Sequence, residues 1–281
     1  MLKAIIKPAS VHLQHYVYSY GMITGRIDSS PLIIPLAARP KQLLTFHFAN
    51  RFDVLSSSLE RITTSPRVVV VGPQSCSQPG LSAYGQIDNF TIHFQPSGFN
   101  ALFGIPMSEL ADFAFDAHGV IGSQVSVLER ELCDTQDFAE RIRITEKHLM
   151  RLARLQDRPD GVAIAANSLY ARHGLIDVKS MATFCGISIR QFERRFAAQI
   201  GVSPKLFARI IRFNAVVDNK LRAPNAAWSH IAQERDYHDQ MHLVHDCKAF
   251  TGESPTQFMK RLGGVPGFQN FYRTAKQVHG N

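Results

Sequence analysis

Six potential metal ligands occur within ten residues in the second half of the chain. The stretch DYHDQMHLVHDCKAFTGESPTQF, residues 236–258, contains His238, Asp239, His242, His245, Asp246 and Cys247. The three histidines are spaced i, i+4, i+7, so in a helix they share one side. Imidazole, thiolate and carboxylate groups are the ligands that zinc takes in proteins. The composition of this stretch therefore points first to a metal site.

An apolar stripe on the same predicted helix argues against a metal. Leu243, Cys247 and Phe250 have the spacing of a face that packs on a core. The histidines then face away from the core, together with Met241, where no partner element encloses them. Structural zinc is typically held by four closed ligands. We therefore expect neither a metal nor another cofactor here.

A repeat gives this helix its context. The residues GVSP at 201–204 recur as GESP at 252–255, 51 residues further on, and the same separation relates Phe192 to Leu243 and Phe196 to Cys247. Glycine can end a helix with positive φ, serine can cap the next helix, and proline suits its first position. Each copy therefore reads as a short helix, a tight turn and a second helix, which is the plan of a helix-turn-helix.

The charge is distributed unevenly between the two halves. The formal net charge is +8; residues 160–281 hold 16 Lys+Arg against 9 Asp+Glu, whereas residues 1–159 hold 15 against 14. A basic half joined to a nearly neutral one is typical of a protein in which one domain meets a polyanion.

Residues 175–262 resemble the DNA-binding domain of the AraC/XylS family of bacterial transcription regulators. The first copy, MATFCGISIRQFERRFAAQIGVSPKLF, is similar to the first helix-turn-helix of that family, and the second resembles its pattern GY-x-DQ-x-H-x-x-x-x-F-x-x-x-x-G-x-(S/T)-P. The resemblance implies two helix-turn-helices joined by a long helix at about 204–221. Their recognition helices would enter successive major-groove segments of double-stranded DNA. It also implies a cytoplasmic transcription factor rather than an enzyme.

The resemblance assigns DNA contacts to individual residues. The implied base-reading positions are Ile189, Arg190, Glu193 and Arg194 in the first copy and Gln240, Met241 and His245 in the second. Arginine can pair with guanine, Glu193 with cytosine and Gln240 with adenine, and Met241 can rest on a thymine methyl group. The predicted phosphate contacts are Ser188, Arg195, Lys205, His238, His242 and Lys248.

The second copy departs from the family pattern at two positions. Asp236 stands where glycine is usual, and Cys247 stands where phenylalanine is usual. Aspartate tolerates the left-handed conformation less well than glycine does. Asp236, Asp239 and Asp246 also bring negative charge towards phosphates. We expect the second copy to bind DNA more weakly than the first or to be less stable.

The first half favours an α+β fold with a β-rich N-terminal domain and an all-α DNA-binding domain. Apolar runs at 43–48, 67–72 and 90–95 predict strands, and helices are predicted at 107–116 and 129–155. The segment QDRPDG, at 156–161, combines proline, glycine and charge and predicts a boundary. The expected domains are 1–158, with a helical linker at about 129–155, and 159–265, followed by a flexible tail at 266–281.

The N-terminal residues also resemble, less sharply, a region found in one group of these regulators. The similar segments are 6–20 and 90–112, and the resemblance implies an effector-binding or dimerisation domain. A small-molecule effector, a second copy of the chain and, for an activator, RNA polymerase are the candidate partners. Candidate ligand-lining residues are Phe46, Phe48, Tyr84 and Phe94, although aromatic stripes on strands are more typical of a core.

An enzyme is the alternative reading of the first half. His47 and His93 lie within predicted strands and are candidate ligands of a β-barrel-type metalloenzyme fused to a DNA-binding module. The chain has no HxH, HExxH or GxSxG motif to support this reading. No apolar run reaches the roughly 18 residues of a membrane span, and the start of the chain lacks the pattern of a secretory signal. The four cysteines are scattered, which is typical of reduced thiols in a cytoplasm.

Overall fold

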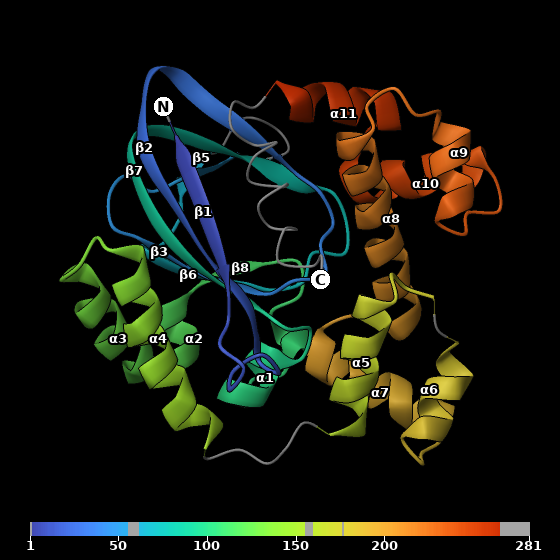
Figure 1. Cartoon of the computed structure of the whole chain (residues 1–281), viewed down its shortest axis with the longest axis horizontal. Helices are drawn as coiled ribbons and strands as arrows, with labels where there is room; N and C mark the ends of the chain where they lie inside the picture. Colours follow the sequence, from blue (N-terminus) through green and yellow to red (C-terminus); the bar gives the residue numbers. More distant parts are fainter. Residues whose placement is uncertain (1, 56–61, 155–159, 176, 265–281) are drawn as a thin grey trace.

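Two long antiparallel strands, β2 and β7, run through the N-terminal part of the molecule (Figure 1). The structure is a computed structural model, and it describes residues 2–55, 62–154, 160–175 and 177–264. The strands are β1 (Lys3–Pro8), β2 (Val17–Leu36), β3 (Leu43–His47), β4 (Asp53–Leu55), β5 (Ile62–Thr64), β6 (Val68–Val71), β7 (Gln78–Phe94) and β8 (Ala114–Asp116). They pair in the order β1-β2-β7-β3-β6-β8, and β4 pairs with both β5 and β7.

Helices complete this part and make up the rest of the described chain. The N-terminal part contains α1 (Gly98–Phe103), the short 3-10 helix η1 (Met107–Glu109), α2 (Ala117–Ile121), α3 (Ser123–Cys133) and α4 (Phe138–Ala153). The C-terminal part contains α5 (Gly161–Ala171), α6 (Val178–Phe184), α7 (Ile189–Ile200), α8 (Pro204–Arg222), α9 (Trp228–Glu234), α10 (Gln240–Thr251) and α11 (Pro255–Gly263). None of the helices in these ranges has the length and apolar character needed to cross a membrane.

Aromatic residues on one face of the sheet form the N-terminal core. Tyr20, Phe46, Phe90 and Phe94 are completely buried, from β2, β3 and β7. Helices α1, α3 and α4 cover them with further apolar residues, among them Phe99, Leu128 and Leu149. The alternation of side chains along each strand places one set inward and the other outward.

Helix α4 is tied to the sheet by a buried ion pair. Arg141 is 1% exposed, and its Nη1 and Nη2 lie 2.6 and 2.9 Å from the two carboxylate oxygens of Asp88 on β7. The guanidinium also lies 4.0 Å from the centre of the Phe48 ring, and its Nε donates to the Thr135 carbonyl oxygen. Arg141 therefore fixes the position of α4 on the β7 and β3 side of the sheet.

The α+β class and the predicted strands at 43–48, 67–72 and 90–95 are confirmed, but two helix predictions are wrong. Residues 107–116 form η1 and then β8, which pairs with β6. The helix predicted at 129–155 is two helices, because residues 134–137 interrupt it and Asp137 caps α4. Helix α4, within the predicted helical linker, contributes residues to the N-terminal core. The predicted domain boundary at 158/159 and the tail at 266–281 lie outside the described residues.

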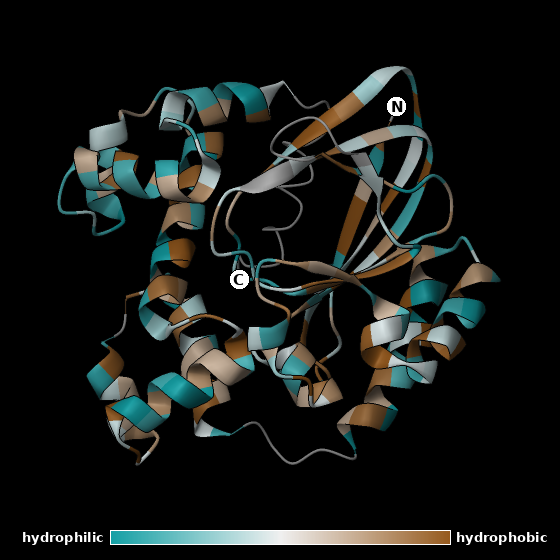
Figure 2. Cartoon of the chain, turned by 180° about the vertical axis from the view of Figure 1, so that it is seen from behind, coloured by the Kyte–Doolittle hydropathy of each residue, from teal (hydrophilic) through white to brown (hydrophobic). Residues whose placement is uncertain are grey.

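The long helix predicted at about 204–221 is α8, and it lies among the shorter helices of the two repeated units. Figure 2 shows apolar and polar patches alternating along these helices, as expected where one face packs on a core. Side-chain caps start most of them, from Asp160, Asp177, Ser188, Ser203, Asp239 and Ser254. Helix α8 runs between the two halves of this domain and contributes to the cores on both sides through residues such as Phe207 and Phe213.

Candidate nucleic-acid interface

Helix α7 buries one face and exposes the other. Phe192 and Phe196 are completely buried, and the ring of Phe196 lies 5.6 Å from that of Phe207 on α8. The four predicted base-reading residues of the first copy all lie on the exposed side: Ile189, Arg190, Glu193 and Arg194. The buried pair therefore determines which residues of α7 are available to a partner.

Helix α10 repeats this division. Leu243, Cys247 and Phe250 are buried, as the apolar stripe predicts. The predicted base-reading residues Gln240, Met241 and His245 are exposed, and Met241 is 70% exposed although it is apolar. The exposed side of α10 is therefore available to a partner, like that of α7.

The two turns between helices have the same construction. Gly201 and Gly252 end α7 and α10 with φ of 95° and 77°. Ser203 and Ser254 then cap α8 and α11 through their side chains, with proline at the first turn of each helix. The repeat read in the sequence is therefore a repeat in the structure.

The predicted phosphate contacts fall into two groups. Lys205, His238, His242 and Lys248 are exposed and point from the termini of α8 and α10 or from the turn before α10. The Ser188 hydroxyl and Arg195, by contrast, are engaged within the chain. Ser188 caps α7 in a capping box with Gln191, and Arg195 Nη2 lies 2.5 Å from the Asp160 carboxylate. Neither the capping box nor the ion pair was predicted from the sequence.

The histidine-rich stretch does not bring its ligand-type side chains together. The His242 ring packs edge-on against Tyr237, at 5.2 Å between ring centres, while Nδ1 of His238 lies 3.3 Å from the Asp239 carboxylate. Cys247 points into the core, where burial raises the pKa of its thiol to about 11. Among the residues that the structure describes, no three of His, Cys, Asp or Glu are placed to hold a metal ion.

The expectation that Asp236, Asp239 and Asp246 bring negative charge towards phosphates is wrong for Asp246. Its side chain is fully buried, with Oδ1 2.6 Å from Nη2 of Arg209 on α8 and Oδ2 3.3 Å from the Tyr237 hydroxyl. Asp239 is the N-cap of α10 and accepts from the backbone N–H of His242. Asp246 directly precedes Cys247 of the apolar stripe, and this position is the signal that could have predicted a buried partner for it.

Asp236 adopts the left-handed conformation that its place in the pattern predicts, with φ of 52°. Nη1 of Arg212 donates to the Asp236 carbonyl oxygen at 3.2 Å, and its guanidinium lies 5.5 Å from the centre of the Tyr237 ring. Arg212 and Arg209 stand one turn apart on α8, so this helix holds both the loop before α10 and α10 itself.

Cys247 occupies a crowded core. It belongs to the same buried cluster as Phe213, Phe250 and Phe258, and it lines a small cavity with Phe213 and Phe258. A phenyl ring is much bulkier than the thiol that it would replace, so the phenylalanine usual in the family would press on the surrounding rings.

Cys247→Phe is expected to lower the free energy of unfolding by about 1–3 kcal/mol through overpacking. The measurement is urea denaturation of the full chain, with Cys133→Phe as the control because Cys133 is exposed. Stability equal to that of the unsubstituted chain would show that the surrounding aromatic rings rearrange at no cost.

The four residues predicted to line a ligand site differ in their surroundings. Phe46 and Phe94 are completely buried core residues, and Phe48 stacks on Phe46 beneath Arg141. Tyr84 is 52% exposed. An aromatic stripe on strands has the same spacing in a packed core as in a binding site, so the ligand-lining role of these residues stays a prediction.

The two strand histidines have partners within the chain. His47 is buried, with Nδ1 2.8 Å from the Asn89 side-chain oxygen, and burial lowers its pKa. Nδ1 of His93 lies 3.2 Å from the Ser19 hydroxyl. Burial, followed by the charges of Lys41 and Arg39, lowers the pKa of His93 to about 3. Both imidazoles are therefore favoured in the neutral form.

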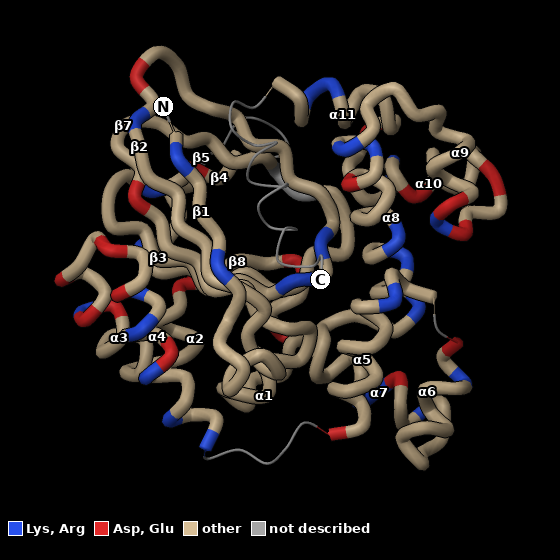
Figure 3. Tube along the Cα trace, in the orientation of Figure 1, with Lys and Arg blue, Asp and Glu red and all other residues tan. Residues whose placement is uncertain are grey.

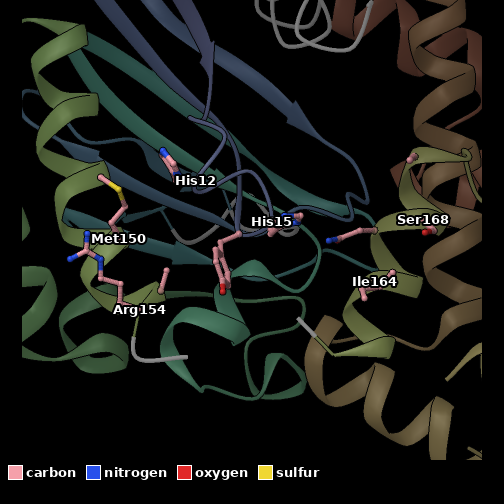
Figure 4. A pocket seen from close by; sticks show the side chains of 10 residues that line it. His12, His15, Met150, Arg154, Ile164 and Ser168 are labelled. Atoms are coloured by element: carbon pink, nitrogen blue, oxygen red, sulfur yellow. The ribbon is translucent and has the colours of Figure 1, made fainter. Parts of the chain in front are cut away.

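A cleft of about 970 Å³ opens between the N-terminal part and α5 (Figure 4). The segment that follows β1, the end of α4 and one side of α5 form its walls. Its lining combines apolar surface with basic or polar side chains, and the residues are His12, His15, Tyr16, Met150, Ala153, Arg154, Ile164, Asn167, Ser168 and Ala171.

The N-terminal part also contacts both helix-turn-helix units directly. A Cβ atom on Gly201 would lie 2.6 Å from the Pro73 side chain, and one on Gly252 would lie 3.2 Å from Oγ of Ser77. The segment 72–77 thus touches the equivalent turn in each unit.

The segment between β2 and β3 makes a second connection. The Ala38 N–H donates to the carbonyl oxygen of Phe250 on α10, and Asn214 of α8 donates to the Ala38 carbonyl oxygen. The Lys41 ammonium lies 3.9 Å from the centre of the Tyr18 ring and 5.6 Å from that of Tyr170 on α5. Burial lowers the pKa of this ammonium to about 8, and Asp218 opposes that shift.

Comparison with known proteins identifies the C-terminal part. Residues 181–261 match a family model described as a helix-turn-helix domain. No curated protein matches the chain significantly.

Among solved structures, the arrangement is similar to ToxT from Vibrio cholerae, at 10% identity and a TM-score of 0.42, over 94% of this chain and 99% of that one. ToxT with bound unsaturated fatty acid has values of 11% and 0.42, over 94% and 96%. ToxT bound to (E)-4-(8-methylnaphthalen-1-yl)but-3-enoic acid has values of 9% and 0.44, over 93% and 98%. Likenesses at this level carry no functional conclusion.

Proposed function

We propose that the chain is a DNA-binding transcription regulator of the AraC/XylS family, and that it inserts α7 and α10 into successive major-groove segments on one face of a duplex; the helix-turn-helix match over residues 181–261 supports this. The segments would lie about one helical turn apart. One observation carries the proposal: the repeated units expose the same side of their recognition helices. Arg194 and His245 stand 51 residues apart, the repeat separation, and both are exposed.

The exposed side chains suit base recognition. Arg190 and Arg194 each offer two donors to guanine N7 and O6, and Glu193 offers an acceptor to the cytosine amino group. On α10, Gln240 can pair with adenine, and Met241 can cover a thymine methyl group. The first unit thus offers mainly charged contacts and the second mainly neutral ones.

Exposed lysines at the start of α8 and near the end of α10 can contact the DNA backbone, whereas Arg209 and Arg212 of α8 are engaged within the chain. Figure 3 shows Lys and Arg at intervals along this helix, between the two recognition helices. Lys205 at its start and Lys248 near the end of α10 are exposed and available to phosphates. Because each neutralised phosphate releases counterions, affinity should fall steeply as salt rises.

Selection of bound duplexes from a random pool by the full chain tests this proposal. We expect an enriched sequence with two short elements about 10 base pairs apart, centre to centre. A linear fall of log affinity with log salt should accompany it. Enrichment of no sequence, or of a single element, would contradict insertion of both helices.

Arg194→Ala is expected to weaken binding to the selected site by about 1–3 kcal/mol, with a much smaller effect on random duplex, because one bidentate base contact is lost. Titration of both duplexes at one salt concentration measures the difference. Arg172→Ala is the matched control, since Arg172 is exposed at the end of α5. Equal losses on both duplexes would place Arg194 on phosphate.

The cleft beside α5 is the place where we propose that a small effector binds. Its volume of about 970 Å³ is of the size that ligand sites in proteins have. Arg154 and two histidines beside apolar walls favour a ligand with an apolar body and an acidic group. Thermal denaturation with a panel of small organic acids tests this idea, and stabilisation that Arg154→Ala abolishes is the expected result. A shift unchanged by Arg154→Ala would place the ligand elsewhere.

We propose that the chain acts by binding rather than by catalysis. The alternative of a metalloenzyme domain predicts stoichiometric zinc, iron or manganese in the purified protein. Metal analysis separates the two. Homodimerisation stays a prediction, and light scattering of the full chain at micromolar concentration measures it.

A further inference from the structure

Each recognition helix forms an ion pair with a neighbouring helix, at the same position of the repeat. Arg195 on α7 and Asp246 on α10 are separated by 51 residues, like the turns that follow them. Arg195 pairs with Asp160 of α5 at 2.5 Å, and Asp246 pairs with Arg209 of α8 at 2.6 Å. The charges are reversed between the copies, yet the position that makes the pair is the same.

The pair on α10 is enclosed. Asp246 is fully buried, whereas the Arg209 side chain is 30% exposed. Nε of Arg209 also lies 3.2 Å from the carboxylate, and the guanidinium lies 5.4 Å from the centre of the Phe250 ring. The Tyr237 hydroxyl donates to the second oxygen of Asp246. Burial, followed by the charge of Asp246, raises the pKa of this hydroxyl, which keeps it a donor.

The pair on α7 is more open but has a similar second contact. Asp160 caps α5 through the Ala163 N–H, and it accepts from Nε2 of Gln199 at 2.9 Å. Burial opposes ionisation, but these two hydrogen bonds and Arg195 outweigh it and lower the pKa of Asp160. Gln199 and Phe250 are again 51 residues apart, and both contact the ion pair of their own unit.

We propose that residues 195 and 246 are positioning residues that fix the rotation of each recognition helix about its own axis. Apolar stripes attach a helix to a core but resist small rotations weakly, whereas a hydrogen-bonded ion pair has a defined direction. In each helix the positioning residue directly follows a base-reading residue, Arg194 or His245. A rotation of α7 or α10 would therefore turn that reading residue away from its base. This inference rests on the proposed insertion of both helices into DNA.

Two single substitutions test the inference, one for each helix. Asp246→Asn removes the charge of the α10 pair at nearly constant shape. Asp160→Asn removes the charge opposite Arg195, and asparagine caps a helix as well as aspartate does. The full-length variants are compared with the unsubstituted chain by selection from the same random duplex pool, after circular dichroism and thermal denaturation have shown that they fold.

We expect each variant to lose base preference in one element of the selected site only. Asp246→Asn should reduce discrimination between bases about 10-fold at the positions read by α10 and leave it unchanged at those read by α7. Asp160→Asn should reduce discrimination at the positions read by α7 and leave it unchanged at those read by α10. A uniform loss of affinity with both preferences intact, or no change, would overturn the positioning role. Failure of the unsubstituted chain to select two elements would instead refute the proposed function.

A further variant covers the case in which Asp246→Asn does not fold. Arg209→Met combined with Asp246→Leu replaces the pair by apolar side chains, an exchange that buried ion pairs often tolerate. We expect this variant to fold and to lose the α10 preference. If it folds and keeps that preference, apolar packing alone positions α10, and the proposal is wrong.

Discussion

Asp88→Ala is expected to lower the free energy of unfolding by about 3–5 kcal/mol, because it leaves a buried guanidinium without its counter-charge. Arg141 is 1% exposed, and Asp88 accepts from two of its nitrogen atoms. The Phe48 ring and the Thr135 carbonyl oxygen remain as partners in the variant but supply no compensating negative charge. Urea denaturation of the full chain, followed by circular dichroism, measures the change.

An exposed pair on the same helix provides the control. Arg143 pairs with Glu140, with side chains 66% and 39% exposed, so Arg143→Ala should have little effect on the free energy of unfolding. Replacing both partners of the buried pair, as Arg141→Met with Asp88→Leu, should recover most of the loss. Similar losses for Asp88→Ala and Arg143→Ala would mean that water reaches Arg141 readily.

The stability of the chain is expected to fall as the pH drops below about 6.5, with His93 as one cause. Its pKa is lowered from 6.5 to about 3 in the folded state by burial and by Lys41 and Arg39. In the pH range between these values the unfolded chain takes up a proton that the folded chain does not. Stability is therefore fully present above pH 6.5 and is lost as the pH falls towards 3. Within this pH range the slope should approach about 1.4 kcal/mol per pH unit, the value for uptake of one proton.

His93→Gln separates this contribution from those of the carboxylates. Glutamine can keep a hydrogen bond with Ser19 but does not titrate, so the dependence of stability on pH from 6.5 to 4.5 should become shallower by up to one proton. Urea denaturation at several pH values gives this slope. An identical slope in both proteins would show that the folded state accommodates a charged His93.

The C-terminal domain was largely predictable because its signals are local. Caps, prolines at first helical positions and turn glycines mark where its helices begin and end, and the repeat supplies an internal check. The apolar stripe on α10 correctly separated the buried residues from the exposed ones. Whether Arg194 or Met241 contacts a base stays a prediction.

The partners of charged side chains were not predictable in the same way. Arg209 and Asp246 are 37 residues apart, and Arg141 and Asp88 are 53 apart, so no local pattern joins them. The N-terminal strands posed a related problem. The sheet edge that β8 occupies is determined by its pairing with β6, and residues 107–116 alone have a spacing that also suits a helix. Aromatic residues on strands have the same spacing in a packed core as in a ligand site, so the sequence alone could not distinguish the two.

The contacts of segment 72–77 with the turns at Gly201 and Gly252 have a consequence for affinity. When two linked DNA-binding units bind one duplex, the second unit binds its DNA element at an effective concentration that the geometry of the link determines. In this chain α8 connects the two helix-turn-helix units. The N-terminal part connects them a second time, because Pro73 and Ser77 touch one turn each. Two connections restrict the relative motion of the helix-turn-helix units, so less conformational entropy is lost when the second unit binds DNA. Because of this restriction, the second unit adds little affinity for a duplex whose two elements are wrongly spaced. The spacing of the elements then becomes part of what the protein recognises.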